Sequence, residues 1–269
     1  MLENPRSPRV RAVAKLSKRS ARVETGLFLL EGPQAVREAL AYRPEGITDL
    51  FATPSAWEKH ADVREAAQAE GAAVTFTTEG VLDAMADTVT PQGLVAVARQ
   101  FPASVRDVFA ASPRLVAICE EVRDPGNLGT IIRAADAAGA DAVVLTGRTV
   151  DPYNPKVVRA TTGSLFHLPI SLGGELEGVL TRARQAGLRV VAADVKGGDL
   201  LEARSSGLLA EPTAWLFGNE ARGLDDDALA LADASLKLPI YGRAESLNLA
   251  TAASVCLYES AFAQRSALA

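Results

Sequence analysis

Three short motifs in the second half of the chain carry polar side chains at turns beside apolar strands. The first runs from Asn127 to Arg133, the second from Gly218 to Gly223, and the third from Leu238 to Asn248. They carry five polar residues in or near turns beside apolar strands: Asn127, Arg133, Glu220, Ser246 and Asn248. Polar side chains in such positions are typical of a binding pocket rather than of a hydrophobic core.

The first motif follows an apolar strand and opens a helix. In an open α/β sheet, ligands bind at this carboxyl end of a strand, and the free amides of a helix start attract anions such as phosphate. Gly126 and Gly129 permit the close approach of another backbone. Arg133 lies roughly two turns into the helix, at the edge of its apolar face. Taken alone, it also fits a surface arginine that pairs with a nearby acid.

The second motif places Glu220 in a turn directly after the apolar residues 215–217. Two interpretations of this carboxylate stay open, because it can pair with Asn127 or fix a loop by accepting backbone N–H bonds. Gly223 then permits a further turn before Asp225, which is a good candidate for a helix cap.

The third motif enters the last helix of the chain. Ser246 is the expected N-cap of that helix, and Asn248 in its first turn can orient a substrate or another loop. Both residues also fit a purely capping role. The apolar side chains of Leu238, Ile240 and Leu247, together with free loop amides, would suit an adenine ring, which has a flat apolar face and a hydrogen-bonding edge.

Strands and helices are expected to alternate along the chain, which predicts an α/β fold. In the first part we expect a helix capped by Ser7, then strands at 27–30, 47–52, 73–76 and 94–98 and helices at 33–42, 55–70 and 79–86. In the second part we expect strands at 115–119, 142–145, 188–193, 214–217 and 235–238, a helix at 125–138, and a last helix from about residue 246. Proline and serine residues mark a linker between these parts. The predicted division is a domain at 1–103, a linker at 104–113 and a second domain at 114–269.

Composition and charge bound the possible partners. Hydrophobic residues make up 48% of the 269 residues and charged residues 23%, which is the balance of a globular protein. The net charge of −5 excludes a polycation. The early segment nevertheless holds seven basic residues and no acid: Arg6, Arg9, Arg11, Lys15, Lys18, Arg19 and Arg22. Such a run is typical of phosphate binding, although a solvated helix face has the same pattern.

Several common kinds of site are not expected. The chain has no GxGxxG turn and no GxxxxGK[ST] loop, which argues against a Rossmann dinucleotide site or a P-loop. His60 and His167 lack recognisable partner ligands nearby, so no metal site is predicted. Cys119 and Cys256 are interpreted as buried free thiols of a reducing compartment. With no signal peptide or membrane span evident, a cytoplasmic location is expected.

The three motifs together resemble those of the SpoU (TrmH-like) family of RNA ribose 2′-O-methyltransferases, within the SPOUT superfamily. The resemblance covers about residues 114–269. More weakly, the segment Phe28-Leu29-Leu30-Glu31-Gly32 resembles a strand of the family's substrate-binding domain, which is similar to certain ribosomal proteins.

The resemblance implies an α/β-knot methyltransferase domain with a deep trefoil knot, preceded by a small α/β domain that binds the RNA substrate. It also implies a homodimer with active sites near the subunit interface and S-adenosylmethionine as methyl donor. The positions that match the family's active-site residues are Asn127, Arg133, Glu220, Ser246 and Asn248. Those that match positions surrounding the donor are Gly218, Leu238, Ile240 and Leu247.

RNA contacts are expected mainly from the basic segment near the start of the chain. Arg9, Lys15, Arg19 and Arg22 are the candidates there, and they would supply salt-dependent affinity for the RNA backbone. Arg159 falls where some relatives of the family place an arginine near the site. Relatives with this kind of first domain resemble enzymes that act on large-subunit ribosomal RNA, so ribosomal RNA is the expected substrate.

The implied reaction is an in-line transfer of the donor's methyl group to a ribose 2′-oxygen, which must lose its proton. The family assigns the base to the arginine at the position of Arg133, although guanidinium groups remain protonated in proteins. Either Arg133 loses a proton in a dry site, or it binds the substrate phosphate and positions the hydroxyl while another group accepts the proton. Three other functions stay open: a non-catalytic RNA-binding or ribosome-assembly factor, a transfer RNA 2′-O-methyltransferase, and a nicotinamide-dependent oxidoreductase, against which the missing GxGxxG counts.

Overall fold

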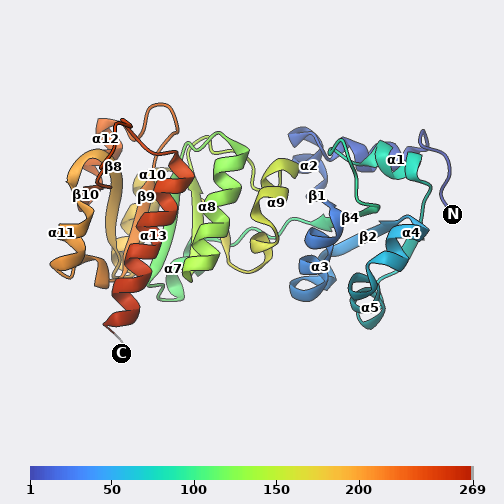
Figure 1. Ribbon diagram of the computed structural model, residues 1–269, viewed down its shortest axis with the longest axis horizontal. Coiled ribbons are helices and arrows are strands. Elements are labelled where there is room, and N and C mark those ends of the chain that lie inside the picture. Colours follow the sequence, from blue (N-terminus) through green and yellow to red (C-terminus); the bar gives the residue numbers. More distant parts are fainter. Residues whose placement is uncertain (268–269) are drawn as a thin grey trace. The chain divides into compact units, whose positions relative to one another are not determined.

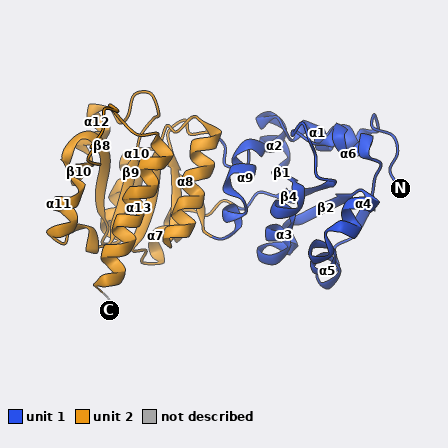
Figure 2. Cartoon of the chain, viewed as in Figure 1, with its two compact units in different colours: residues 1–101, 151–167 blue, residues 102–150, 168–269 orange. Residues whose placement is uncertain are grey.

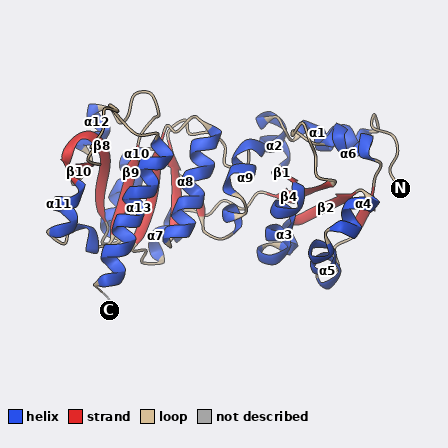
Figure 3. Ribbon diagram, in the orientation of Figure 1, coloured by secondary structure: helices blue, strands red, loops and turns tan. Residues whose placement is uncertain are grey.

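The computed structural model describes residues 1–267, and its chain divides into two compact units (Figures 1 and 2). Unit 1 consists of residues 1–101 and 151–167, and unit 2 of residues 102–150 together with residues from 168 onward. Both units alternate strands and helices, as Figure 3 shows, so the α/β prediction is confirmed. Within the described part of the chain, no helix has the length and apolar character needed to span a membrane.

Unit 1 is built on a four-stranded sheet in the order β1-β4-β2-β3. The strands are β1 (Leu27–Glu31), β4 (Leu94–Arg99), β2 (Ile47–Ala52) and β3 (Val74–Phe76). β4 is antiparallel to both of its neighbours, whereas β2 and β3 are parallel. The helices are α1 (Pro8–Lys15), α2 (Arg19–Thr25), α3 (Gly32–Tyr42), α4 (Pro54–Lys59), α5 (Ala61–Ala69), α6 (Glu79–Met85) and α9 (Pro155–Thr161).

The first helix forms for the reason that the sequence indicates. Ser7 caps α1, its Oγ accepting the backbone N–H of Val10 at 3.3 Å. Val10, Val13 and Leu16 are buried in a core that includes Phe51 of β2. The basic segment therefore lies on α1, whose apolar face belongs to the core of unit 1, and on α2, whose buried residue is Arg22.

Residues 151–167 belong to unit 1 by their contacts, although the expected division placed them in the second domain. The buried Tyr153 packs against Phe28 of β1 with ring centroids 4.8 Å apart, and its hydroxyl accepts the N–H of Phe101 at 2.9 Å. The Arg22 guanidinium pairs with Asp151 at 2.7 Å. Aromatic packing and a buried ion pair thus hold this segment against strands that come much earlier in the sequence.

Unit 2 is built on a six-stranded parallel sheet in the order β10-β8-β9-β5-β6-β7. The strands are β5 (Leu115–Glu120), β6 (Ala142–Thr146), β7 (Ile170–Leu172), β8 (Arg189–Asp199), β9 (Thr213–Phe217) and β10 (Ala234–Lys237). The helices are α7 (Val105–Ala110), α8 (Pro125–Ala138), α10 (Leu176–Gln185), α11 (Leu200–Ser205), α12 (Asp226–Ala230) and α13 (Leu249–Ser266). The expected linker contains α7, and α7 packs into the core of unit 2 through Val108 and Phe109.

Helices cover both faces of this sheet, as a parallel sheet requires. α7 and α10 pack on the face to which Ile118 and Leu216 point. α8 and α13 cover the other face, where the buried indole of Trp215 donates to the Ser260 hydroxyl of α13 at 2.9 Å (Figure 1). Cys119 of β5 is a buried free thiol, and burial raises its pKa to about 12.

We predict that Arg22→Ala destabilises unit 1 by about 3 kcal/mol, because it leaves Asp151 without its buried partner. Arg22 also donates to the carbonyls of Leu16 and Ser17, so the same change removes two further hydrogen bonds. Hydrogen exchange of the β1 amides, measured over a series of urea concentrations, gives the loss in free energy of unfolding. The exposed Arg19→Ala is the matched control, and equal effects of the two substitutions would contradict the structural role of Arg22.

Candidate active site

The three sequence motifs meet at the carboxyl edge of the sheet in unit 2. β5 and β9 are neighbouring parallel strands, so the loops that follow Glu120 and Phe217 leave the sheet side by side. The loop after β10 reaches the same region at the start of α13, because Asn248 hydrogen-bonds Asn127. The parallel sheet therefore brings together segments that lie far apart in sequence, such as Asn127 and Asn248, which are 121 positions apart.

Glu220 fixes the turn that starts α8. Its carboxylate accepts the backbone N–H of Arg123 at 3.1 Å and that of Asp124 at 2.9 Å. Asp124 in turn caps α8 by accepting the N–H of Asn127 at 2.7 Å. Both interpretations of Glu220 from the sequence are confirmed, since it holds a loop and also accepts a bond from the Asn127 side chain at 3.4 Å.

Asn127 connects all three motifs through its side-chain amide. Its Nδ2 donates to Glu220, and its Oδ1 accepts the Nδ2–H of Asn248 at 2.9 Å. The Asn248 oxygen caps α13 by accepting the N–H of Ala250 at 2.9 Å and that of Thr251 at 3.3 Å. Each amide thus has its donor and acceptor ends assigned, which orients the network Glu220–Asn127–Asn248.

Asn248, rather than Ser246, is the N-cap of the last helix, which corrects the sequence prediction. α13 begins at Leu249, and Ser246 lies exposed in the preceding loop. Both residue types are good caps, and Asn248 takes the position because its amide can bond Asn127 at the same time. Ser246 stays in the third motif loop without a place in the amide network.

Arg133 lies on the outward face of α8, away from the core. Leu128, Ile131 and Ile132 form the buried face, as predicted, and Arg133 is exposed. Its guanidinium makes no hydrogen bond or ion pair with any residue in the part of the chain that the structure describes. No contact among residues 1–267 therefore ties Arg133 to Glu220, and the alternative of a surface arginine bridged to an acid is not what this part of the structure shows.

The residues expected around a donor lie in two loops, one after β9 and one between β10 and α13. At Gly218 a Cβ atom would lie 2.5 Å from the carbonyl carbon of Gly223, so the turn tolerates no side chain. Ile240 and Leu247 expose 39% and 41% of their surface, although both are large apolar residues, and Leu238 is half-buried. An exposed apolar loop beside a close-packed glycine turn fits the adenine ring of a nucleoside donor.

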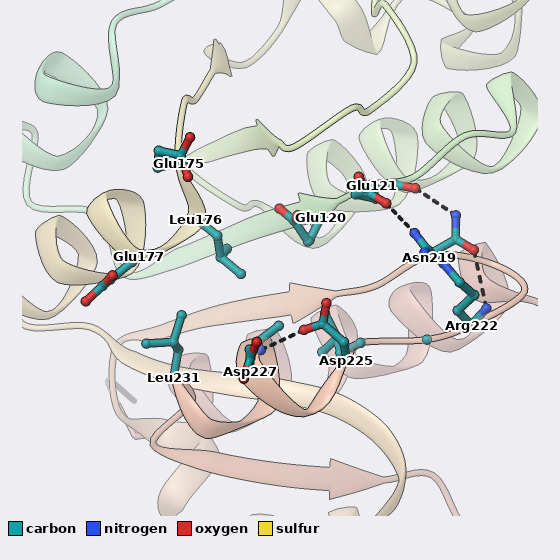
Figure 4. Close-up of a pocket in the computed structure, with 13 residues that line it drawn as sticks. Glu120, Glu121, Glu175, Leu176, Glu177, Asn219, Arg222, Asp225, Asp227 and Leu231 are labelled. Atoms are coloured by element: carbon teal, nitrogen blue, oxygen red, sulfur yellow. Dashed lines mark hydrogen bonds and ion pairs between the residues drawn. The ribbon is translucent and has the colours of Figure 1, made fainter.

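The outer side of the same loops holds contacts that sequence reasoning did not assign (Figure 4). Asn219 donates its side-chain amide to the carbonyl of Glu121 at 2.9 Å, and Arg222 forms an ion pair with the Glu121 carboxylate. A cavity of about 460 Å³ lies beside them. Asn219 and Arg222 stand inside the second motif, but their partner could be identified only from the structure.

Glu120 lines this cavity among other acids. Its Oε2 is buried without a hydrogen-bond partner among the described residues. Burial raises the pKa of Glu120, and the nearby carboxylates of Glu121, Asp225 and Glu175 raise it further. The ionised form of Glu120 is therefore disfavoured in the folded protein.

The basic residues of unit 1 divide into paired and unpaired groups. The Arg9 guanidinium bonds Asp49 at 2.6 Å and lies 4.9 Å from the centre of the Phe51 ring. Lys15 and Arg19 are exposed and make no such contact with any residue between 1 and 267. Arg22 is only 1% exposed and paired, so its predicted contact with RNA is not compatible with the structure.

Arg159 also has partners within unit 1. It bonds the nearly buried carboxylate of Glu31 at 3.3 Å and the carboxylate of Asp87 at 3.1 Å. Glu31 accepts the backbone N–H groups of Asp87 and Thr88 as well. These contacts hold the loop that follows α6.

Comparison with known proteins gives consistent matches along the chain. The sequence profile described as SpoU rRNA Methylase family matches residues 114–258, and the profile described as MRM3-like substrate binding domain matches residues 7–96. The 23S rRNA (guanosine(2553)-2′-O)-methyltransferase RlmP of Bacillus subtilis is 33% identical over 96% of this chain and 97% of its own length.

Two solved structures with bound AdoMet are similar over nearly the whole chain. The rRNA methyltransferase of Sinorhizobium meliloti is 34% identical with a TM-score of 0.83, covering 96% of each chain. The SpoU methyltransferase AviRb of Streptomyces viridochromogenes is 28% identical with a TM-score of 0.84, covering 97% of this chain and 100% of its own.

We predict that Glu120→Gln raises the melting temperature at pH 7. A carboxyl whose pKa is raised on folding holds its proton more tightly in the folded state, so the wild type loses stability as pH rises above the ordinary value of 4.5. The amide cannot ionise and escapes this loss. Thermal unfolding from pH 4 to pH 8 measures the difference, which should shrink towards the acid end. An equal rise in melting temperature at pH 4 and at pH 8 would contradict a raised pKa of Glu120.

Proposed function

The chain belongs to the SpoU rRNA methylase family, and from this membership we propose that it transfers the methyl group of S-adenosylmethionine to a ribose 2′-hydroxyl of ribosomal RNA. The single observation that carries the proposal is the network Glu220–Asn127–Asn248, which joins all three motifs at one edge of the sheet. Relatives that match over both units are named as 23S rRNA 2′-O-methyltransferases, which supports the choice of RNA. Binding alone would not require this set of polar residues, which argues against a non-catalytic factor.

The donor would lie against the second and third motif loops. The exposed apolar side chains of Ile240 and Leu247 would contact the adenine, with Leu238 beside them, and the close-packed turn at Gly218 would offer its backbone to the nucleoside. When bound, S-adenosylmethionine supplies an electrophilic methyl group on a sulfonium. The chain's own contribution is to bind the donor and to hold the ribose in line with that methyl group.

Arg133 would bind the phosphate next to the acceptor ribose. A guanidinium stays protonated and binds phosphate in a bidentate manner, and the exposed Arg133 has no carboxylate partner in the described chain that would compete. Of the two roles that stayed open for this residue, its surroundings favour phosphate binding and positioning of the hydroxyl. Asn127, Asn248 and Ser246 would complete the ribose site.

We also propose that two copies of the chain form a homodimer through α8 and α13. Val255, Tyr258 and Phe262 form an exposed apolar stripe on α13, with the two aromatic rings 5.5 Å apart. Exposed apolar stripes of this kind mark interaction surfaces. α8 lies beside α13, so a second copy on this face would bring Arg133 to the subunit interface. We further propose that unit 2 contains the deep trefoil knot that the family resemblance implies.

RNA would be bound by unit 1, whose match to a substrate-binding profile supports this role. Lys15, Lys18 and Arg19 are the exposed basic residues that we assign to the RNA backbone, whereas Arg9 and Arg159 are engaged in ion pairs. The bacterial rRNA methyltransferases among its relatives support a cytoplasmic location.

The proposed reaction is tested with purified protein, labelled S-adenosylmethionine and unmodified ribosomal or transfer RNA. We expect label in ribosomal RNA and resistance of one phosphodiester linkage to alkali, because a methylated 2′-oxygen cannot attack the adjacent phosphate. Label in transfer RNA alone would favour the second substrate class, and the absence of transfer to any RNA would favour a non-catalytic factor.

We predict that Arg133→Ala lowers kcat by about 100-fold or more, the usual effect of removing a positioned charged donor. Arg133→Lys should lose most activity too, because an ammonium cannot replace a bidentate guanidinium. The donor Kd, measured by calorimetry, should change less than about twofold. Arg106→Ala, on the opposite face of the sheet, is the control. Near-normal methyl transfer by Arg133→Ala would remove this residue from the mechanism.

We predict that replacing Lys15, Lys18 and Arg19 with glutamine weakens RNA binding in a salt-dependent way. The slope of log Kd against log salt should fall by roughly one for each phosphate group that the variant no longer binds. Deleting the whole segment is not a suitable test, because α1 supplies core residues of unit 1. The double variant Arg106→Gln with Arg182→Gln, in unit 2, is the control. An unchanged slope in the triple variant would show that α1 and α2 do not contact RNA phosphates.

A further inference from the structure

The turn from Asn219 to Gly223 is held by the loop after β5 on two sides. On one side the Glu220 carboxylate binds two backbone N–H groups of that loop. On the other side Asn219 donates to the Glu121 carbonyl, and Arg222 pairs with the Glu121 carboxylate (Figure 4). The second set of contacts involves none of the residues assigned to the amide network.

Glu121 occupies a backbone conformation that residues with a side chain rarely adopt. Its φ is +53°, in the left-handed region that favours glycine. Such strain persists only where the surrounding structure compensates for it, and it is concentrated at functional sites. At Glu121 the compensation comes from the ion pair with Arg222, from a second pair with Arg123 at 3.3 Å, and from the bond that its carbonyl accepts.

Hydrogen bonds within the turn connect the residues that contact Glu121 to the backbone beside Gly218. Asn219 Oδ1 accepts the N–H of Ala221 at 3.0 Å and that of Arg222 at 3.3 Å, while its amide group bonds Glu121. The Asn219 and Gly223 backbones exchange two hydrogen bonds, of 3.0 and 2.8 Å, directly beside Gly218. These hydrogen bonds restrain the backbone of the whole turn, and the ion pair between Glu121 and Arg222 holds the turn against the loop after β5.

We propose that Glu121 and Arg222 are positioning residues for the methyl donor, acting through the turn that Gly218 begins. The inference rests on the proposed function, because it assigns the ligand of this turn as S-adenosylmethionine. Their ion pair keeps the turn in its binding conformation before the donor arrives, which lowers the ordering cost of binding. The strain at Glu121 is retained because glycine at this position would lose the carboxylate that anchors Arg222.

The test uses the full chain and three variants: Arg222→Gln, Glu121→Gly and the double variant. Each single variant should raise the calorimetric Kd for S-adenosylmethionine about fivefold, the upper range for a partly exposed ion pair. The double variant should be no worse than Glu121→Gly alone, because Glu121→Gly already removes the ion pair with Arg222. The KM for donor should rise in parallel while kcat at saturating donor is retained.

Stability separates positioning from a merely structural role. Glu121→Gly relieves the left-handed strain, so its melting temperature should equal or exceed that of the wild type while its donor affinity falls. Arg204→Gln is the matched control, since it breaks the 2.8 Å ion pair between Arg204 and Glu259 elsewhere in unit 2.

Two results would overturn the inference once the wild type is shown to bind the donor. One is an unchanged Kd in both single variants. The other is a double variant whose loss is the product of the two single losses, which would mean that the residues act independently. A wild type that binds no donor would instead contradict the proposed function itself, so the two failures are distinguishable.

Discussion

The carboxylate of Glu220 is the interaction on which the rest of the site depends. It accepts two backbone N–H groups from the turn that opens α8, and it also accepts a bond from Asn127. Bonds to an ionised acceptor are stronger than those between neutral groups, and helix starts offer unpaired N–H groups to such an acceptor. One side chain from the loop after β9 thereby fixes the loop after β5, and Asn127 extends the connection to the start of α13.

The two helices that begin at this network also determine the outer surface of unit 2. α8 and α13 both start there, under the caps Asp124 and Asn248, and run in the same direction. At their other ends the Arg265 guanidinium lies against Gly139, where a Cβ would come within 2.7 Å of it. Their outward faces carry Arg133 and an apolar stripe. A residue assigned to the reaction and a surface suited to a second copy are thus products of the same packing.

The sequence predicted most elements where local signals are strong. Residues 125–138 form the expected helix, because Pro125 suits a first turn and Gly139 adopts the left-handed conformation that ends it. One expected helix, at 55–70, is instead two helices that meet at His60, whose backbone leaves the helical region without any glycine or proline to signal it. The pairing of Glu220 with Asn127 was one of two interpretations that the sequence left open, and it forms because both residues follow neighbouring strands of one parallel sheet. Contacts between distant parts of the chain could not be predicted in this way. Arg22 appeared as one more basic residue of an exposed run, and its burial depends on Asp151, which is 129 positions away.

The cap of the last helix could not be chosen between Ser246 and Asn248 by propensity, since the deciding bond is made to another helix. Glu121 carries no local signal for its conformation, because glutamate has no preference for the left-handed region.

Three loops of unit 2, in the interpretation proposed here, form one donor site at the carboxyl edge of its sheet. Hydrogen–deuterium exchange of the full chain, with and without saturating S-adenosylmethionine, is the most direct test of that site. We expect slower exchange in residues 120–127, 218–224 and 238–250 together, with the strands of unit 1 unchanged. Protection of one of these loops alone, or of a surface elsewhere, would show that the three loops do not share the donor.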